Sequence, residues 1–535
     1  MNKRKRISLI VIGIIVTIVI IFSLFANSIA KNKIEALLKN NIPDHIENSY
    51  KSISVNVLGG SISFKDLNLL IKVKDTSLIR ANIKMESFTI GGLSYWDYLF
   101  NDEIHIGKLK FDALQLTYYK DHKNQAKDST IKDKPFKLPK PIIIDKINFK
   151  NSRVSIFENS KDSTLLSSKI INLDINDILL NENTLSNRIP IDYGDILIKT
   201  EDIFFKVGIY ENLNIAQIEI ENNNISIKDI LLKTKYSKTE LSKIITKERD
   251  HIDVNIGELK INPINFGFEN DTLFINSKLI TINNPDAAFY RDKLVRDDLK
   301  VKKLYSKSIR ELPIKLTVDS IAISNGKVAY SEKVHAENPA GTLILSDLNG
   351  GITNLSNTYS SPKKTTINVD GIFMNDTPMN ASWSFDINQT NDAFTFKGHL
   401  GKLEASDMNA FITPLINAEL EGDIFETYFE ITGDFNQSII HLSQNYDSIK
   451  LDLLNKKRKK MKTLSEIANV FINDDSQVGD DVFHNVTANA SRDKTKSFFN
   501  YLARNLKASL LIMFTKKNKT EKQKTNKHKD RKKAN

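Results

Sequence analysis

The 535-residue chain contains no cysteine, and this absence removes several classes of site at once. Without thiols there is no disulfide framework, no thiolate metal site and no cysteine nucleophile. A cysteine-free chain is compatible with an oxidising compartment, although it does not require one.

The motifs of common enzyme classes are also missing. The nine histidines are scattered, and none stands four residues from another, so the zinc-binding His-Glu-x-x-His pattern is absent. There is no Gly-x-Ser-x-Gly elbow, no phosphate-binding glycine loop and no dinucleotide fingerprint. We therefore expect no catalytic residue, no cofactor, no metal site and no enzymatic activity. A hydrolase built on the long segments 120–140 and 284–312 stays open as an alternative, because loops of that length are often functional.

The body of the chain carries little net charge. The formal charge is +11, but residues 515–535 hold ten Lys/Arg against Glu521 and Asp530, and Lys3 to Arg6 are all basic. A nucleic-acid-binding body would show a basic face with interleaved aromatic residues, and we find none. We expect no nucleic-acid partner, and we interpret residues 515–535 as a polybasic disordered tail.

One long uncharged run lies near the N-terminus, from Ile7 to Ala26. At about 1.5 Å per helical residue, this run is long enough to cross a hydrocarbon core of about 30 Å. The basic residues before it favour a cytoplasmic N-terminus. We predict an uncleaved single-pass anchor within residues 1–30, although Ser28 to Ala30 would also fit a cleavage site. The anchor residues are Ile7, Ile15, Ile21 and Phe25.

Strand-like alternation dominates the body, and residues 316–330 show how it is organised. Apolar and polar residues alternate, and the alternation then slips by one residue at Asp319-Ser320. Such a slip normally sends the later side chains to the opposite face of a sheet. A β-bulge at Asp319-Ser320 would keep them on one face, and Asn325-Gly326 predicts a tight turn into a return strand.

The same spacing of six apolar positions recurs along the chain. Besides 316–330, it is filled by residues 104–118, 142–156, 213–227 and 254–268, and a weaker copy with a Gly59-Gly60 turn spans 50–64. We interpret these copies as bulged hairpins that pair edge to edge, although any β protein contains hairpins of this kind. The predicted fold is mainly β, an elongated, curled antiparallel sheet over residues 31–454, in the form of a repeating β-groove.

Beyond residue 454 the pattern changes, and we predict a helical and loop region over 455–514. Residues 497–514 are expected to form an amphipathic helix that lies at a membrane interface. Its apolar side comprises Phe499, Leu502, Leu506, Leu510 and Met513.

A sheet with one apolar face has two outcomes. If a second layer covers that face, the result is a closed core, and the protein would be an envelope scaffold or adaptor that binds other proteins. If the face stays open, it forms a trough that acyl chains fill. The residues predicted to line the trough are Ile104, Ile106, Leu109, Phe111, Ile144, Ile147, Phe149, Ile215, Ile218, Ile220, Ile256, Leu259, Ile261, Leu316, Val318, Ile321, Ile323, Val328 and Tyr330.

Several segments resemble the AsmA-like proteins of the bacterial envelope. They are the N-terminal run with its charged helix, Val55-Asn-Val-Leu-Gly-Gly-Ser-Ile-Ser-Phe64, the recurrent Ile-x-x-Leu-x-Ile pattern, and the C-terminal motifs Met408-Asn-Ala-Phe-Ile-Thr-Pro414, Glu421-Gly422, Gly433-Asp434, Tyr446 to Leu451 and Ser497-Phe-Phe-Asn-Tyr-Leu502. The resemblance implies a repeating β-groove, an inner-membrane anchor and a periplasmic body. It also implies a role in phospholipid transport or outer-membrane biogenesis. The implied partners are phospholipid acyl chains, the inner membrane and outer-membrane components, and no catalytic residue is carried over.

Overall fold

The computed structural model describes residues 23, 25–36, 38–40, 42–74, 76–121, 138–455, 458–463, 465 and 482–514. The fold is mainly β, as predicted. The chain divides into two compact units between residues 230 and 231.

No helix in the described ranges is both long and apolar enough to cross a bilayer. The expected anchor residues Ile7, Ile15 and Ile21, and the tail 515–535, lie outside these ranges, and Phe25 is exposed on a helix over 25–36.

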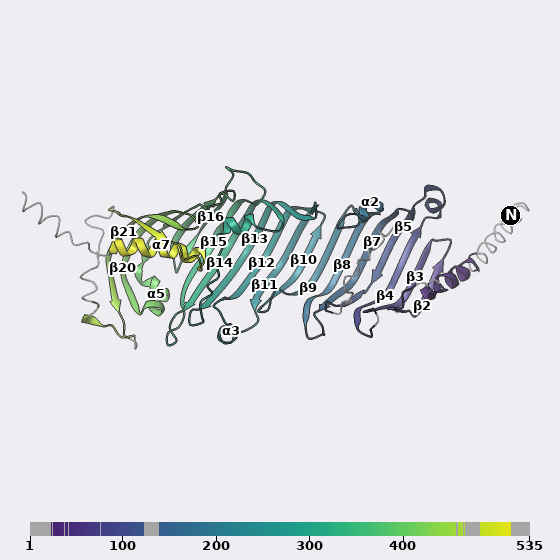
Figure 1. Ribbon diagram of the computed structural model, residues 1–535, viewed down its shortest axis with the longest axis horizontal. Coiled ribbons are helices and arrows are strands. Elements are labelled where there is room, and N and C mark those ends of the chain that lie inside the picture. Colours follow the sequence, from purple (N-terminus) through teal and green to yellow (C-terminus); the bar gives the residue numbers. More distant parts are fainter. Residues whose placement is uncertain are drawn as a thin grey trace, which may run out of the picture. The chain divides into compact units, whose positions relative to one another are not determined.

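The strands of the first unit follow one another along a sheet (Figure 1). They are β1 (Ile46–Ser49), β2 (Ser52–Asn56), β3 (Ser61–Lys72), β4 (Ile79–Leu93), β5 (Ile104–Asp112), β6 (Gln115–Tyr119), β7 (Ile142–Phe157), β8 (Thr164–Leu180), β9 (Ile196–Lys206), β10 (Glu211–Glu221) and β11 (Asn224–Thr234), which crosses the unit boundary. Two short helical segments, η1 (Asp97–Asn101) and α2 (Glu182–Leu185), lie between them.

The second unit repeats this plan, and it begins with four strands of 16 to 21 residues. Its strands are β12 (Asp250–Glu269), β13 (Thr272–Asp292), β14 (Lys315–Lys333), β15 (Gly341–Ser356), β16 (Thr365–Phe373), β17 (Thr377–Phe385), β18 (Phe394–Leu400), β19 (Leu403–Glu404), β20 (Ala418–Gly433), β21 (Gln437–Leu453) and β22 (His484–Ser491). Its helices are α3 (Lys238–Ile244), α4 (Tyr305–Arg310), η2 (Ala405–Met408), α5 (Asn409–Ile416) and α7 (Phe498–Phe514). The region 455–514, predicted as helix and loop, therefore also contains a strand.

The prediction of a purely antiparallel sheet is wrong. β5 and β6 both pair with β7 in parallel, and β13 pairs with β14 in parallel, whereas the other pairings recorded within each unit are antiparallel. A parallel pair needs a long crossover to bring the chain back to its starting end. The segment 293–314 makes the crossover between β13 and β14. Residues 284–292, predicted as part of a charged helix or loop, belong to β13.

Most of the predicted hairpin turns are also wrong. Asn325 and Gly326 lie inside the continuous strand β14, where the pairing with β15 shifts register at Gly326. Segments 142–156 and 254–268 are likewise single strands, β7 and β12. The Gly59-Gly60 turn is confirmed between β2 and β3, and a turn at Asn222 and Asn223 separates β10 from β11.

The slip in alternation is real, but it does not come from a bulge at Asp319-Ser320. The register of β14 is constant across this point, because Val318 pairs with Ser277 and Ser320 with Leu279. In the first unit the slip is explained by Asp66, whose backbone is left-handed with φ of 49°. Phe64 and Leu67, on either side of it, pack in the same buried cluster as Met85. Left-handed aspartate or asparagine also lies within the strands at Asn151, Asp177, Asp202, Asp229, Asn284, Asn325, Asp347 and Asn354.

We predict that Asp66→Val lowers the free energy of unfolding by about 1–2 kcal/mol, because a branched side chain in the left-handed region meets the following carbonyl. Asp66→Asn should remain within about 0.5 kcal/mol of the parent, since asparagine tolerates that conformation. Chemical denaturation of both variants measures the difference. An equal loss in the two variants would contradict a backbone origin and point to the exposed Lys51–Asp66 pair instead, whose atoms are 3.8 Å apart.

Candidate functional site

The strands of the first unit align their apolar residues in rows that run across the sheet. One row joins Phe64, Phe88, Phe111 and Phe149 as direct cross-strand partners and continues through Leu173, Ile198 and Ile220. The ring centroids of its phenylalanines are 6.1, 4.8 and 4.4 Å apart along the row. A second row joins Ile62, Ile90, Leu109, Ile147, Ile175 and Ile196.

The other face of this sheet is charged. Lys110, between Leu109 and Phe111 in the sequence, lies 2.7 Å from Asp112. Further along, Lys146 is 3.2 Å from Asp174, and Lys199 is 3.5 Å from Glu219. Because side chains alternate across a strand, these ion pairs mark the solvated side, and the rows of phenylalanine and isoleucine occupy the opposite side.

No second sheet covers the rows in the described part of the first unit. The predicted lining residues Ile104, Ile106, Leu109, Phe111, Ile144, Ile147, Phe149, Ile215, Ile218 and Ile220 are all half-buried. Neighbours in the rows shield their flanks, and the remaining surface is accessible. One closely packed cluster lies at the N-terminal end, where Ile34 and Leu38 of the N-terminal helix pack against Ile53, Phe64, Leu67 and Met85.

The second unit contains a longer row of the same kind. It joins Ile261, Ile280, Ile321, Ile352, Ile367, Trp383, Phe396, Ile431, Ile440 and Ala488 as successive cross-strand partners. Its first members, Ile261 and Ile280, are half-buried, whereas Ile431 and Ile440 are fully buried. The row therefore passes from an accessible part of the sheet into a closed core.

Helix α7 makes that closed core (Figure 1). Phe498 stacks on Trp383 with ring centroids 4.3 Å apart, and Tyr501 and Met513 are buried in the same cluster as Ile431 and Ile440. The Ser438 hydroxyl donates to Asn505 Oδ1 at 2.9 Å, which holds the helix to β21. The amphipathic helix is thus present, but its apolar side packs on protein.

The predicted membrane-facing side of this helix is therefore wrong. Leu502 and Met513 are buried, Leu506 and Leu510 pack against the cluster, and only Phe499 of the predicted set is exposed. The buried side also contains Asn505 and Ser509, both fully buried. These polar residues form local hydrogen bonds and allow the helix to approach the sheet closely. A pattern built on apolar residues alone could not identify them.

The remaining predicted lining residues lie in β12 and β14. Ile256, Leu259, Leu316, Ile323, Val328 and Tyr330 are half-buried, whereas Val318 and Ile321 are buried. The predicted set therefore comes together in rows within each unit. It omits equivalent positions in β4, β8, β9 and β13, where the spacing of the repeat is different. In β8, β9 and β13 the left-handed residues Asp177, Asp202 and Asn284 interrupt the strands, and an aspartate or asparagine between two apolar pairs is the sequence signal for such positions.

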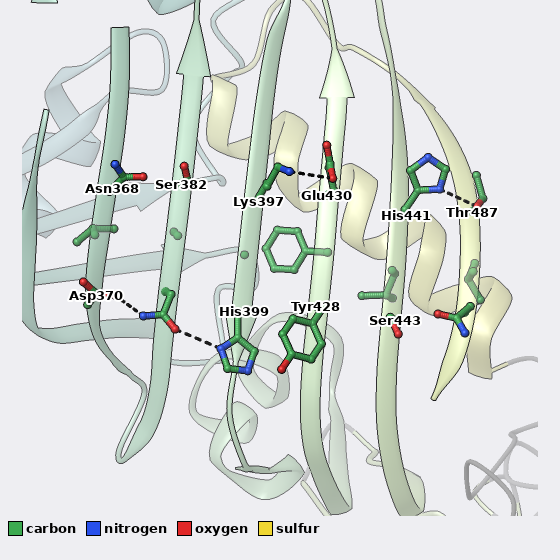
Figure 2. A pocket seen from close by; sticks show the side chains of 18 residues that line it. Asn368, Asp370, Ser382, Lys397, His399, Tyr428, Glu430, His441, Ser443 and Thr487 are labelled. Carbon is green, nitrogen blue, oxygen red and sulfur yellow. Dashed lines mark hydrogen bonds and ion pairs between the residues drawn. The ribbon is translucent and has the colours of Figure 1, made fainter. Parts of the chain in front are cut away.

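A hollow of about 620 Å³ lies on the face of β16, β17, β18, β20, β21 and β22 that points away from α7 (Figure 2). His441 and Ser443 flank the buried Leu442, so they point outward. His399 stacks on Tyr428, and its ring nitrogens are 3.2 Å from Asn380 and 3.3 Å from Glu426.

The hollow does not assemble a hydroxyl nucleophile of the usual kind. His441 Nδ1 lies 2.9 Å from the Thr487 hydroxyl, but the carboxylate of Glu430 on the neighbouring strand is paired with Lys397 at 3.2 Å. Activation of a hydroxyl requires a base that a third group orients. We interpret these contacts as ordinary hydrogen bonds and ion pairs on a solvated sheet surface.

Asp97, Glu103 and His105 bring potential metal-ligand atoms within 4.8 Å of one another. However, both ring nitrogens of His105 are engaged, Nε2 with Asp145 at 2.7 Å and Nδ1 with Asp97 at 2.9 Å. Bonds to these two carboxylates, that to Asp145 first, raise the pKa of His105, and bonds from Ser94, His105 and Asn101 lower the pKa of Asp97. The geometry favours a protonated imidazole clamped between carboxylates.

This clamp predicts a pH-dependent local stability of η1. Because the pKa of His105 is raised in the folded state, its contribution is complete below the ordinary value of 6.5 and is lost as pH rises through the folded pKa. We expect hydrogen exchange over residues 97–101, corrected for intrinsic rates, to be slower on the acid side of this transition. In His105→Gln the difference between the two sides should vanish; an unchanged difference in that variant would contradict the clamp.

Comparison with models of known protein families and with curated protein sequences gives no match to this chain.

Proposed function

We propose that this protein is a membrane-anchored envelope protein of the AsmA-like type that binds phospholipid acyl chains along its apolar rows. In this proposal residues 7–26 cross the inner membrane with the N-terminus in the cytoplasm. The bulk of the chain lies in the periplasm, and the apolar face of each sheet is a groove. The protein takes part in phospholipid transport between envelope membranes or in outer-membrane biogenesis, and no bond is made or broken.

The observation that carries the proposal is the combination of continuous rows and partial exposure. Rows such as Phe88–Phe111–Phe149 offer hydrocarbon without a hydrogen-bonding requirement, because the strand backbones are already paired. Covering such a face stabilises a complex by about 25 cal/mol for each Å² of apolar surface removed from water. An acyl chain is the natural occupant, since it is flexible and has no polar group to satisfy.

The charged face supports the same proposal. Ion pairs such as Lys146–Asp174 keep that side of the sheet in water, so the two faces of one strand have opposite preferences. A conduit needs this asymmetry, because head groups and solvent must remain outside while the chains are sheltered. The exposed ion pairs add little stability, and their role is to fix which side is wet.

An envelope scaffold with a closed β core is the second candidate, and helix α7 is the observation that favours it. At the end of the second unit the apolar row is buried under Phe498, Tyr501 and Met513, as a protein core would be. The two candidate functions differ in the rows that no helix covers. The lipid-binding function requires these rows to be open to acyl chains, whereas the scaffold requires them to be buried.

Site-specific photocrosslinking of the full chain in cells tests lipid occupancy directly. We predict that a photoreactive benzoylphenylalanine at position 149 yields a phospholipid adduct, detected by mass spectrometry, because Phe149 lies in the half-exposed row. The same residue at the adjacent position 150 should give none, since Lys150 is exposed on the charged side. Equal adducts at both positions, or none at 149, would rule out selective lipid binding by the row.

Charge substitutions separate an open face from a closed core. Ile323→Asp should lower the free energy of unfolding by about 1–2 kcal/mol and leave a cooperative transition, because its carboxylate reaches water. Ile431→Asp, at a fully buried position of the core under α7, should cost more than about 4 kcal/mol or prevent folding. Thermal and chemical denaturation measure both, with Ala322→Asp on the opposite face as control. Equal losses at Ile323 and Ile431 would favour the scaffold.

A further inference from the structure

A group of large apolar side chains on the first unit is exposed to solvent and belongs to none of the rows. It comprises Leu58, Tyr95, Trp96, Tyr98, Leu99 and Phe100, all exposed by half or more, and is called here the aromatic patch. Soluble surfaces rarely expose so much contiguous apolar area without a binding role. The patch lies on η1, on the two residues before it and on the turn between β2 and β3.

The patch is held together by specific contacts. The Tyr95 hydroxyl donates to the Val57 carbonyl at 2.7 Å, and this bond joins the segment just before η1 to the turn that carries Leu58. The rings of Trp96 and Phe100 lie with their centroids 4.3 Å apart. The clamp on Asp97 through His105 fixes the first residue of η1. These side chains are therefore exposed on an ordered support.

The composition of the patch matches the boundary between a bilayer and water. Tryptophan and tyrosine are enriched at that boundary, because their rings are amphipathic. Leu99 and Phe100 add apolar side chains of the kind that enter the acyl region. Lys140 lies at the rim, with its ammonium 3.9 Å from the centre of the Tyr98 ring and 3.2 Å from Asp102, and a lysine at the edge suits lipid phosphates.

The position of the patch in the chain points to a bilayer as the surface that it contacts. The uncharged run ends at Ala26, and the next residue, Asn27, accepts a hydrogen bond from the Val57 backbone N–H through its side-chain oxygen at 2.7 Å. Val57 precedes Leu58 of the patch and receives the Tyr95 bond. The point where the chain leaves its apolar run is therefore bonded directly to the support of the patch.

We propose that the aromatic patch docks on the surface of the same phospholipid bilayer that holds residues 7–26, with Trp96, Leu99 and Phe100 inserted at the interface. The docking rests on the membrane anchorage in the proposed function but not on lipid binding by the rows. A second attachment beside the anchor restricts the swing of the β body, which a flexible tether alone would allow. A soluble protein or a second copy of the chain is the competing occupant.

The chain contains two tryptophans, which makes the test selective. The full chain is reconstituted as single copies in lipid nanodiscs, with phospholipids brominated either near the glycerol end or near the methyl end of one acyl chain. Trp383→Phe leaves Trp96 as the sole emitter, whereas Trp96→Phe leaves Trp383, which is stacked on Phe498. If Trp383→Phe disturbs the core under α7, subtraction of the Trp96→Phe signal from that of the unmodified chain isolates Trp96 instead.

We expect brominated lipid to reduce Trp96 emission at least twofold, more strongly with bromine near the glycerol end, and to affect Trp383 much less. The paired change Leu99→Asp and Phe100→Asp should weaken the quenching of Trp96. Unquenched Trp96 emission that aqueous iodide suppresses would overturn the proposal, and so would quenching that appears only when several copies share a disc. Photocrosslinking at position 149 is read independently, so failure of lipid binding by the rows and failure of the patch to dock are distinguishable.

Discussion

Everything in this fold depends on keeping apolar side chains on one face of very long strands. β12 and β13 contain 20 and 21 residues, far more than the five or six typical of globular sheets. Strict alternation would serve this purpose only if the sequence never slipped, and it slips repeatedly. A left-handed aspartate such as Asp66 allows Phe64 and Leu67 to pack in one cluster. Aspartate and asparagine suit this role because they enter the left-handed region more readily than other non-glycine residues.

The positions of the apolar residues could be predicted from the sequence, but the connectivity could not. In segment 316–330 the apolar positions are correct, yet the expected turn at Asn325-Gly326 lies inside one strand. The residues that favour a tight turn are also those that tolerate a left-handed interruption within a strand, so local chemistry does not separate the two. The parallel pairing of β13 with β14 was equally inaccessible, because it is set by which distant strand the crossover reaches.

The candidate site was predictable in part, for a related reason. Phe111, Phe149, Ile147 and Ile220 were identified because their segments share one spacing. Leu173 and Ile198 in the same row were missed because β8 and β9 carry their left-handed residues, Asp177 and Asp202, at other offsets. The helix predicted over 497–514 spans 498–514, and most of its predicted apolar side packs on the core. The buried side also includes Asn505 and Ser509, whose hydrogen bonds appear only in the folded state.

The contrast within the second unit bears on our proposal that an uncovered row binds a lipid rather than a protein. Under α7, each row member meets a shaped partner, as when Phe498 stacks on Trp383, and polar contacts such as Ser438 to Asn505 fix the helix in place. Ile261 and Ile280 are direct cross-strand partners with half-buried apolar side chains, and neither belongs to the core cluster that contains α7. A protein ligand would have to satisfy its own backbone donors and acceptors against such a surface, at the cost of unmade hydrogen bonds. An acyl chain has no such groups, and this difference is the physical reason for our proposal that the uncovered rows bind lipid.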